Sequence, residues 1–126
     1  MSTIYLRIED LLEVEKRLGA PGIRDVGLLE SALARPQATV FGDDAYPTFV
    51  LKASALVHSL VTNRALIDGN KRLGYVALRL FLEMNDYRLV ADEEDRFGFI
   101  MAIADGSLSD VEAIAGRLGP LMRPLG

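Results

Sequence analysis

Apolar residues recur at intervals of three and four along most of this chain, which is the spacing of an amphipathic or buried α-helix. Residues 8–18 follow this spacing and end at the turn signal Gly19-Ala20-Pro21-Gly22. Asp25 can cap a second helix, and Pro36 ends it because a proline ring clashes with a continuing helix. The pattern therefore predicts two helices joined by a short turn at the start of the chain.

Two further segments are the most apolar in the chain. Thr48 can cap a helix that runs to about Asn63 and leaves few solvated positions, so we expect this helix to be central and buried. After a break at 63–69, residues 70–84 form a second strongly apolar helix. The break is therefore a short polar loop held between two buried helices.

Two segments depart from the helical pattern. Residues 37–47 read as a loop, and its aromatic residues Phe41 and Tyr46 are candidates for contact with a target or partner protein, with ordinary packing as the alternative. Residues 87–90 alternate like a short strand, and we expect them to pair with residues 4–6 as a small ribbon.

The C-terminal part of the chain returns to helical spacing. Residues 92–104 form one helix, and Ser109 and Glu112 have the spacing of a capping box for a last helix, which ends near Leu118. A chain of 126 residues is long enough for one hydrophobic core. The prediction is a single all-α domain over residues 1–126, with a small two-stranded β ribbon.

Composition narrows the classes of function. The net charge of −4 argues against nonspecific binding to a nucleic-acid backbone, because that binding needs many Lys and Arg side chains. The chain has no cysteine and a single histidine, His58, so it offers neither a disulfide framework nor a Cys and His zinc site. The longest apolar segment, 53–61, falls short of a membrane span and the start lacks a leader pattern, so we expect a cytoplasmic protein.

Candidate chemistry gathers in the loop between the two apolar helices. The helix after Gly69 leaves N–H groups unpaired in its first turn, where the helix dipole favours an anion. Lys71 and Arg72 add cationic donors, and Asp68 can cap the helix, hold a metal ion against phosphates or orient another group. We therefore predict a phosphate site over Asp68-Gly69-Asn70-Lys71-Arg72, with an ordinary exposed turn as the alternative.

The segment Arg64-Ala-Leu-Ile-Asp-Gly-Asn-Lys-Arg72 resembles the Fic/Doc family signature, which in its Doc form reads His-x-Phe-x-Asp-Gly/Ala-Asn-Lys-Arg before a helix. Residues 24–36 also resemble the segment that Doc-like proteins carry before their central helices. The similarity extends from about Tyr5 to Leu118. It implies a Fic/Doc helical bundle and the transfer of a group from a nucleoside triphosphate to a protein hydroxyl.

The resemblance also implies an activity, cofactors and partners. Fic enzymes typically transfer an adenylyl group, whereas the Doc branch is a kinase that uses ATP and Mg²⁺ to phosphorylate a threonine of elongation factor EF-Tu and arrest translation. Lys71 resembles the Doc form, which favours a kinase over the alternative, a Fic adenylyltransferase. Doc proteins belong to toxin–antitoxin pairs, so the expected partners are a cognate antitoxin, with a disordered segment that folds onto the toxin, and the elongation factor as substrate.

Residue roles are implied in the same way. Asp68 would lie near the metal ion or the nucleophile, and the amides around Gly69 and Asn70 would bind the anion. Lys71 and Arg72 would neutralise the phosphates during transfer.

Arg64 is the main departure from the signature, because the family has a histidine at this position as the general base. A guanidinium group with a pKa of roughly 12.5 or higher offers no lone pair at neutral pH. Base catalysis contributes about a hundredfold to ten-thousandfold, so this chain is expected to be an impaired enzyme or a non-catalytic nucleotide- or antitoxin-binding protein. Three explanations for Arg64 stay open: a natural pseudoenzyme, a substitution that made a toxin tolerable to its producing cell, and a role of its own with phosphate. We do not expect His58, inside the preceding helix, to replace the base.

Overall fold

The computed structural model describes residues 2–126 and is dominated by helices. Within these residues the α-helices are α1 (Ile8–Leu18), α2 (Val26–Ala34), α3 (Phe49–Thr62), α4 (Asn70–Met84), α5 (Glu93–Ala104) and α6 (Val111–Leu118). Two 3₁₀-helices, η1 (Arg35–Gln37) and η2 (Gly119–Leu121), and two small two-stranded sheets complete the described part. The all-α prediction is confirmed. None of the helices in this range is long and apolar enough to cross a membrane.

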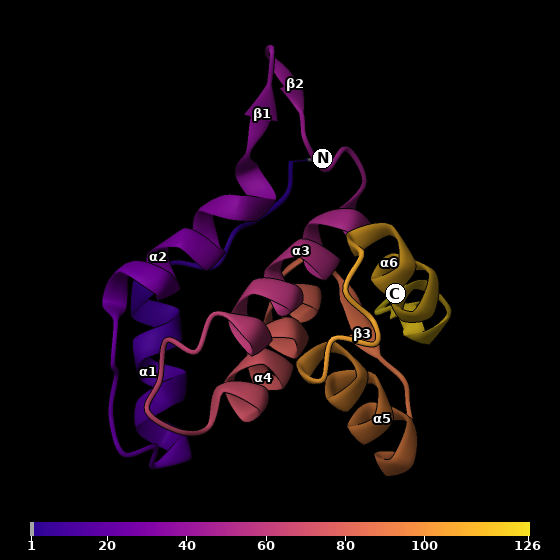
Figure 1. Cartoon of the computed structure of the whole chain (residues 1–126). Coiled ribbons are helices and arrows are strands. Elements are labelled where there is room, and N and C mark those ends of the chain that lie inside the picture. The colour runs from indigo at the N-terminus through magenta and orange to yellow at the C-terminus, as the bar shows by residue number, and fades with distance from the viewer. Residues whose placement is uncertain (1) are drawn as a thin grey trace.

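The centre of the fold is the pair α3 and α4. In Figure 1, α3 lies between α1 and α2 on one side and α5 and α6 on the other. The two helices approach closely where α4 carries Gly74, since a Cβ atom there would lie only 2.6 Å from Cγ2 of Val61. Both helices contribute fully buried side chains to the core, among them Leu56 and Leu60 from α3 and Leu73 and Leu78 from α4. The loop that joins the two helices therefore lies next to a tightly packed contact between them.

Three of the predicted helix starts are confirmed by side-chain caps. Asp25, Thr48 and Asp92 each accept a hydrogen bond from the amide three residues further on, at 3.3, 3.3 and 2.7 Å. The capping box predicted at Ser109 is wrong. Helix α6 has Asp110 at its N-cap position, and no side-chain cap hydrogen bond is formed there.

The predicted ribbon of residues 4–6 and 87–90 is also wrong in its pairing. Strand β3 (Tyr87–Leu89) pairs in antiparallel fashion with β4 (Met122–Pro124), a strand that the sequence pattern did not indicate. The N–H and carbonyl of Ile4 are instead bonded by the side chain of Asn85, both at 2.8 Å. Because these backbone groups are satisfied by a side chain, the N-terminal segment has no need of a strand partner.

The predicted loop at 37–47 contains a β-hairpin. Strands β1 (Thr39–Val40) and β2 (Asp43–Asp44) are joined by Phe41 and Gly42, which have φ angles of 52° and 84°. Positive φ at both central residues is the geometry of a tight hairpin turn, but Phe is not a residue that signals it in a sequence. The hairpin projects from the body before the start of α3, at the end of that helix remote from the α3–α4 loop (Figure 1).

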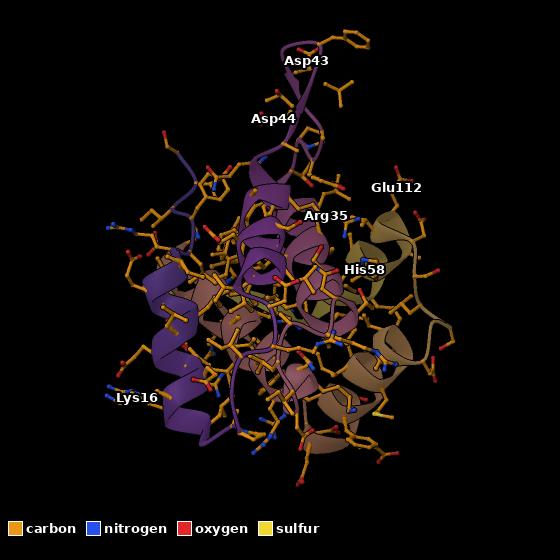
Figure 2. The ribbon with its side chains drawn as sticks, turned by 60° about the vertical axis from the view of Figure 1, so that its left-hand side comes forward. Lys16, Arg35, Asp43, Asp44, His58 and Glu112 are labelled. Carbon is orange, nitrogen blue, oxygen red and sulfur yellow. The ribbon has the colours of Figure 1, made fainter. Side chains whose placement is uncertain are left out.

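Arg35 and Lys52 anchor the base of the hairpin. Arg35 lies beside His58 (Figure 2) and donates to its Nδ1 at 2.9 Å, and its Nε donates to the Tyr46 hydroxyl at 2.9 Å. Buried Lys52 donates to Asp44 Oδ2 at 3.2 Å and to the carbonyl of Tyr46. Tyr46 is therefore a packing residue, whereas the Phe41 side chain at the tip is fully exposed.

Candidate active site

The loop between α3 and α4 has an unusual backbone at each end. Arg64 has a φ of 56° and Gly69 a φ of 94°, both in the left-handed region. Glycine adopts this region freely, but a residue with a Cβ atom held there costs about 1–3 kcal/mol. Such strain persists only where the surroundings hold it, and it is concentrated at functional sites in proteins. The first position of the predicted motif is therefore held in a strained conformation.

Two side chains fix the middle of this loop. Asn70 closes a ring with Leu66, since its Oδ1 accepts from the Leu66 amide at 2.9 Å and its Nδ2 donates to the Leu66 carbonyl at 3.0 Å. Asp68 accepts from the amide of Gly69 at 2.8 Å through Oδ1. The Asn70 side chain is thus committed to loop structure, whereas Asp68 keeps its second oxygen for another partner.

Helix α4 begins at this loop with its first-turn amides uncovered. Gly69 is the N-cap residue, and within residues 2–126 no side chain caps the helix. The amides of Asn70, Lys71 and Arg72 therefore face outward at the positive end of the helix dipole. A helix end with free amides and a glycine for close approach is a ready binding site for an anion.

All six residues predicted for the site lie on the wall of one cavity of about 560 Å³. They are Arg64, Asp68, Gly69, Asn70, Lys71 and Arg72. This volume falls in the range of ligand pockets in proteins, roughly 300–1,000 Å³. The structure thus brings the six predicted residues together on a single concave surface.

The cavity is strongly cationic. Arg24, Arg64, Lys71 and Arg72 all line it, and Asp68 is the only acidic residue on its wall in the part of the chain that is described. None of the four cations forms an ion pair with a carboxylate in that part. Several unpaired cations on a concave surface raise the local concentration of anions, so the cavity is suited to a ligand with more than one negative charge.

Sequence reasoning missed Arg24 and Thr62 as cavity residues. Arg24 stood within the family-like segment 24–36, but its exposed position in a turn gave no sign of where its side chain goes. Thr62 is the last residue of α3 and gave no signal at all. His58 does not line the cavity. It lies in α3 about one turn before Thr62, and its ring is hydrogen-bonded to Arg35.

The residues of the cavity fit a metal site that the protein and a bound phosphate form together, rather than a site formed by protein ligands alone. Among residues 2–126 no group of three or more His, Cys, Asp and Glu side chains could hold a metal ion. Mg²⁺ is commonly bound by one or two carboxylates together with the phosphates of a substrate. Asp68, with one free carboxylate oxygen on the cavity wall, fits this second arrangement.

A second cavity, of about 460 Å³ and largely apolar, lies next to the first. Lys71 and Arg72 line both cavities. The second is formed by α1, α4 and α5, and its wall includes Tyr75, Ile100 and Phe97, whose side chain is 66 % exposed. An exposed apolar groove with a cationic rim is suited to an amphipathic protein segment.

Comparison with known proteins identifies a family and a relative. The model of the Fic/DOC family matches residues 5–82, a range that includes α1 to α4 and the loop of the candidate site. A protein named Toxin Doc from Mycolicibacterium smegmatis (strain ATCC 700084 / mc(2)155) is 44 % identical over 119 residues, which cover 92 % of each chain.

Proposed function

This chain belongs to the Fic/DOC family, and from that premise we propose that it is the toxin of a toxin–antitoxin pair, a protein kinase by descent that is impaired at Arg64. The similarity to Toxin Doc extends over nearly the whole chain, which supports the toxin role. One observation carries the kinase proposal: the six residues predicted for the site line one cationic cavity at the start of a helix.

The proposed ligand is ATP, bound by its phosphates. The free amides of Asn70 and Lys71 bind phosphate oxygens, and the side chains of Lys71 and Arg72 neutralise the charge that is transferred. Mg²⁺ bound between Asp68 and the phosphates would supply further charge neutralisation. Since the frame formed by α3 and α4 is rigid, these groups are in position before the ligand arrives.

The proposed reaction is phosphoryl transfer to a protein hydroxyl. The hydroxyl oxygen attacks the γ-phosphorus of ATP and ADP leaves; where position 64 is the family's histidine, that histidine takes the hydroxyl proton, whereas Arg64 cannot accept it. The presence of Lys71 in the signature supports a kinase rather than an adenylyltransferase. The proposed substrate is a threonine of elongation factor EF-Tu, on the strength of the family resemblance.

Arg64 makes the present chain a better binder than a catalyst. Its guanidinium cannot take a proton at neutral pH, but it adds a fourth cation to a cavity suited to phosphates. This observation favours a second candidate function, a nucleotide- and antitoxin-binding protein without turnover.

The proposed antitoxin site is the apolar groove beside the phosphate cavity. A segment that folded into this groove would cover Tyr75, Phe97 and Ile100 and would reach Lys71 and Arg72, which belong to both cavities. One bound segment would therefore block access to the phosphate site. This arrangement supports a partner that neutralises the toxin by covering it.

The test compares the chain as given with Arg64→His and with a matched control, Arg64→Gln, which removes the cation without adding a base. Each protein is incubated with a bacterial extract, or with purified elongation factor, and with ATP labelled at the α or the γ position. We expect Arg64→His to transfer γ label about a hundredfold to ten-thousandfold faster than the other two proteins.

Three outcomes would count against parts of the proposal. Transfer of α label would identify an adenylyltransferase. Equal activation in Arg64→Gln would mean that the histidine acts only by removing a positive charge. If Arg64→His neither labels a protein nor slows growth of a producing cell, the toxin proposal fails.

A further inference from the structure

The turn between α1 and α2 is bonded to the loop of the candidate site. The backbone amides of Arg24 and Asp25 both donate to the carbonyl of Ala65, at 2.8 and 3.0 Å. Next to these bonds, an antiparallel bridge pairs Ile23, the residue before Arg24, with Leu66, the residue after Ala65. A template segment about forty positions earlier in the chain, residues 23–25, therefore holds the backbone of this loop in place through hydrogen bonds.

Arg24 adds a side-chain clamp to this template. Its Nε donates to the carbonyl of Arg64 at 3.0 Å, and its Nη2 donates to the same oxygen. Two residues of the loop have a left-handed backbone, Gly69 and Arg64, and Arg64, at a φ of 56°, is the one that has a Cβ atom. The clamp therefore acts on the strained residue itself, while the template bonds hold the next one.

Two successive carbonyls of the loop are fixed by Arg24, one by its side chain and one by its backbone. Fixing both carbonyls sets the peptide planes that follow residue 64, which limits its ψ and the course of the chain beyond it. The direction of a side chain depends on the backbone angles of its own residue. The hydrogen bonds from Arg24 to the carbonyls of residues 64 and 65 therefore influence where the side chain of residue 64 points.

We propose that Arg24 is a positioning residue, whose guanidinium clamps the carbonyl of residue 64 and so holds this position left-handed with its side chain on the cavity wall. This inference rests on the proposed function for its catalytic consequence. The clamp acts through the backbone, so it serves a histidine at position 64 as it serves Arg64.

A direct role for Arg24 with the ligand is the competing interpretation, since Arg24 also lines the cavity. A lysine at position 24 would distinguish the direct role from the positioning role. A ligand contact needs a positive charge, which lysine keeps, whereas two donors on one carbonyl need the planar fork of a guanidinium.

The first experiment uses the Arg64→His protein and adds Arg24→Ala, Arg24→Lys or the control Arg17→Ala, which removes an exposed arginine of α1 that is paired with Glu13. Because misplacing a reacting group by about 1 Å can cost about a hundredfold in rate, we expect Arg24→Ala to lower kcat by about that factor. The KM for ATP should stay close to that of the parent, and Arg24→Lys should not restore kcat.

The second experiment needs no catalysis and uses the chain as given. A positive φ brings the amide proton and Hα of one residue close together, which gives a strong NMR cross-relaxation signal within that residue. We expect this signal at Arg64 in the parent and in Arg17→Ala, and its loss in Arg24→Ala and in Arg24→Lys. If Arg64→His proves inactive, this measurement still tests the clamp, so failure of the proposed function is distinguished from failure of the inference.

Two results would overturn the positioning role. One is a loss confined to the KM for ATP that Arg24→Lys restores, which would make Arg24 a direct ligand contact. The other is an Arg64 that keeps its positive-φ signal in Arg24→Ala or in Arg24→Lys. The lysine variant keeps the charge and most of the length of the side chain, so it serves as the comparison should the alanine variant unfold.

Discussion

The side chain at position 64 decides whether the site can take a proton from a hydroxyl group. Arg64 has no lone pair for that purpose at neutral pH, although the surrounding residues Asp68, Lys71 and Arg72 keep the arrangement of the family signature. A single residue can therefore separate the two abilities that are proposed for this cavity. Binding of phosphate depends on amides and cations, whereas turnover depends on a base.

His58 has a structural role and should make stability depend on pH. A guanidinium only donates hydrogen bonds, so Nδ1 of His58 must accept from Arg35, and neutral His58 carries its proton on Nε2. Burial, followed by the charge of Arg35, lowers the pKa of His58 below its ordinary value. The unfolded chain therefore binds a proton near pH 6.5, while the folded chain binds it only at lower pH.

We predict that the thermal unfolding temperature is level above about pH 7 and falls as the pH drops below about 6.5, because protonation of His58 favours the unfolded state. The measurement is unfolding by circular dichroism between pH 8 and pH 5.5. His58 is the only histidine in the chain, so His58→Asn is a clean control and should flatten the curve in this window. An equal slope in parent and variant would contradict the assignment.

At the scale of elements, the contact between α3 and α4 holds the two helices that flank the loop of the candidate site. Gly74 allows the two helices to approach, and the stiff, β-branched side chain of Val61 occupies the space where a Cβ atom would lie. The loop with the signature begins two residues after Val61 and ends five residues before Gly74. Any change in the distance between these helices is therefore passed to both ends of the loop.

We predict that Gly74→Ala destabilises the fold by about 1–3 kcal/mol, because the added methyl group has no room beside Val61. The control is Gly116→Ala in α6, where a Cβ atom meets nothing within 4 Å. That variant should gain about 0.5–1 kcal/mol, since alanine is the better helix former. The free energy of unfolding in urea measures both changes, and effects of the same sign would refute the packing argument.

At the scale of the whole molecule, two cavities of different chemistry share a wall. Lys71 and Arg72 line both the cationic cavity of the candidate site and the apolar groove. The hairpin with Phe41 at its tip lies near the opposite end of α3 and lines neither cavity (Figure 1). A ligand in the cationic cavity and a protein segment in the groove would therefore compete at these two cations.

We predict that Phe97→Asp weakens binding of the cognate antitoxin by about ten- to a hundredfold, because burial of a large apolar side chain contributes about 1.5–3 kcal/mol. The assay is growth of cells that produce the Arg64→His toxin together with its antitoxin. Phe97→Asp should remain toxic but escape neutralisation, whereas the control Val26→Asp, on the exposed start of α2, should still be neutralised. Full neutralisation of Phe97→Asp would place the antitoxin elsewhere.

Local signals explain which parts of the fold could be predicted. The caps at Asp25, Thr48 and Asp92 and the bounds of α1 and α4 depend on neighbours within a few positions, and the sequence pattern identified all of them. The partner of β3 and the hairpin at 37–47 were not identified. Strand β4 contains Pro124 and Arg123, and the hairpin turn contains Phe41, so neither segment carries the usual composition of its structure.

The sequence by itself determined the helical frame, the order of the helices and a signature in which a cation replaces the expected base. These features follow from spacing and residue type, which are properties of short stretches of chain. Only the tertiary structure decided that Arg24 clamps the carbonyl of Arg64, that Lys71 and Arg72 belong to two cavities, and that His58 is bonded to Arg35. Each of these contacts joins residues far apart in the chain, or depends on how helices pack, and no periodicity records such a meeting.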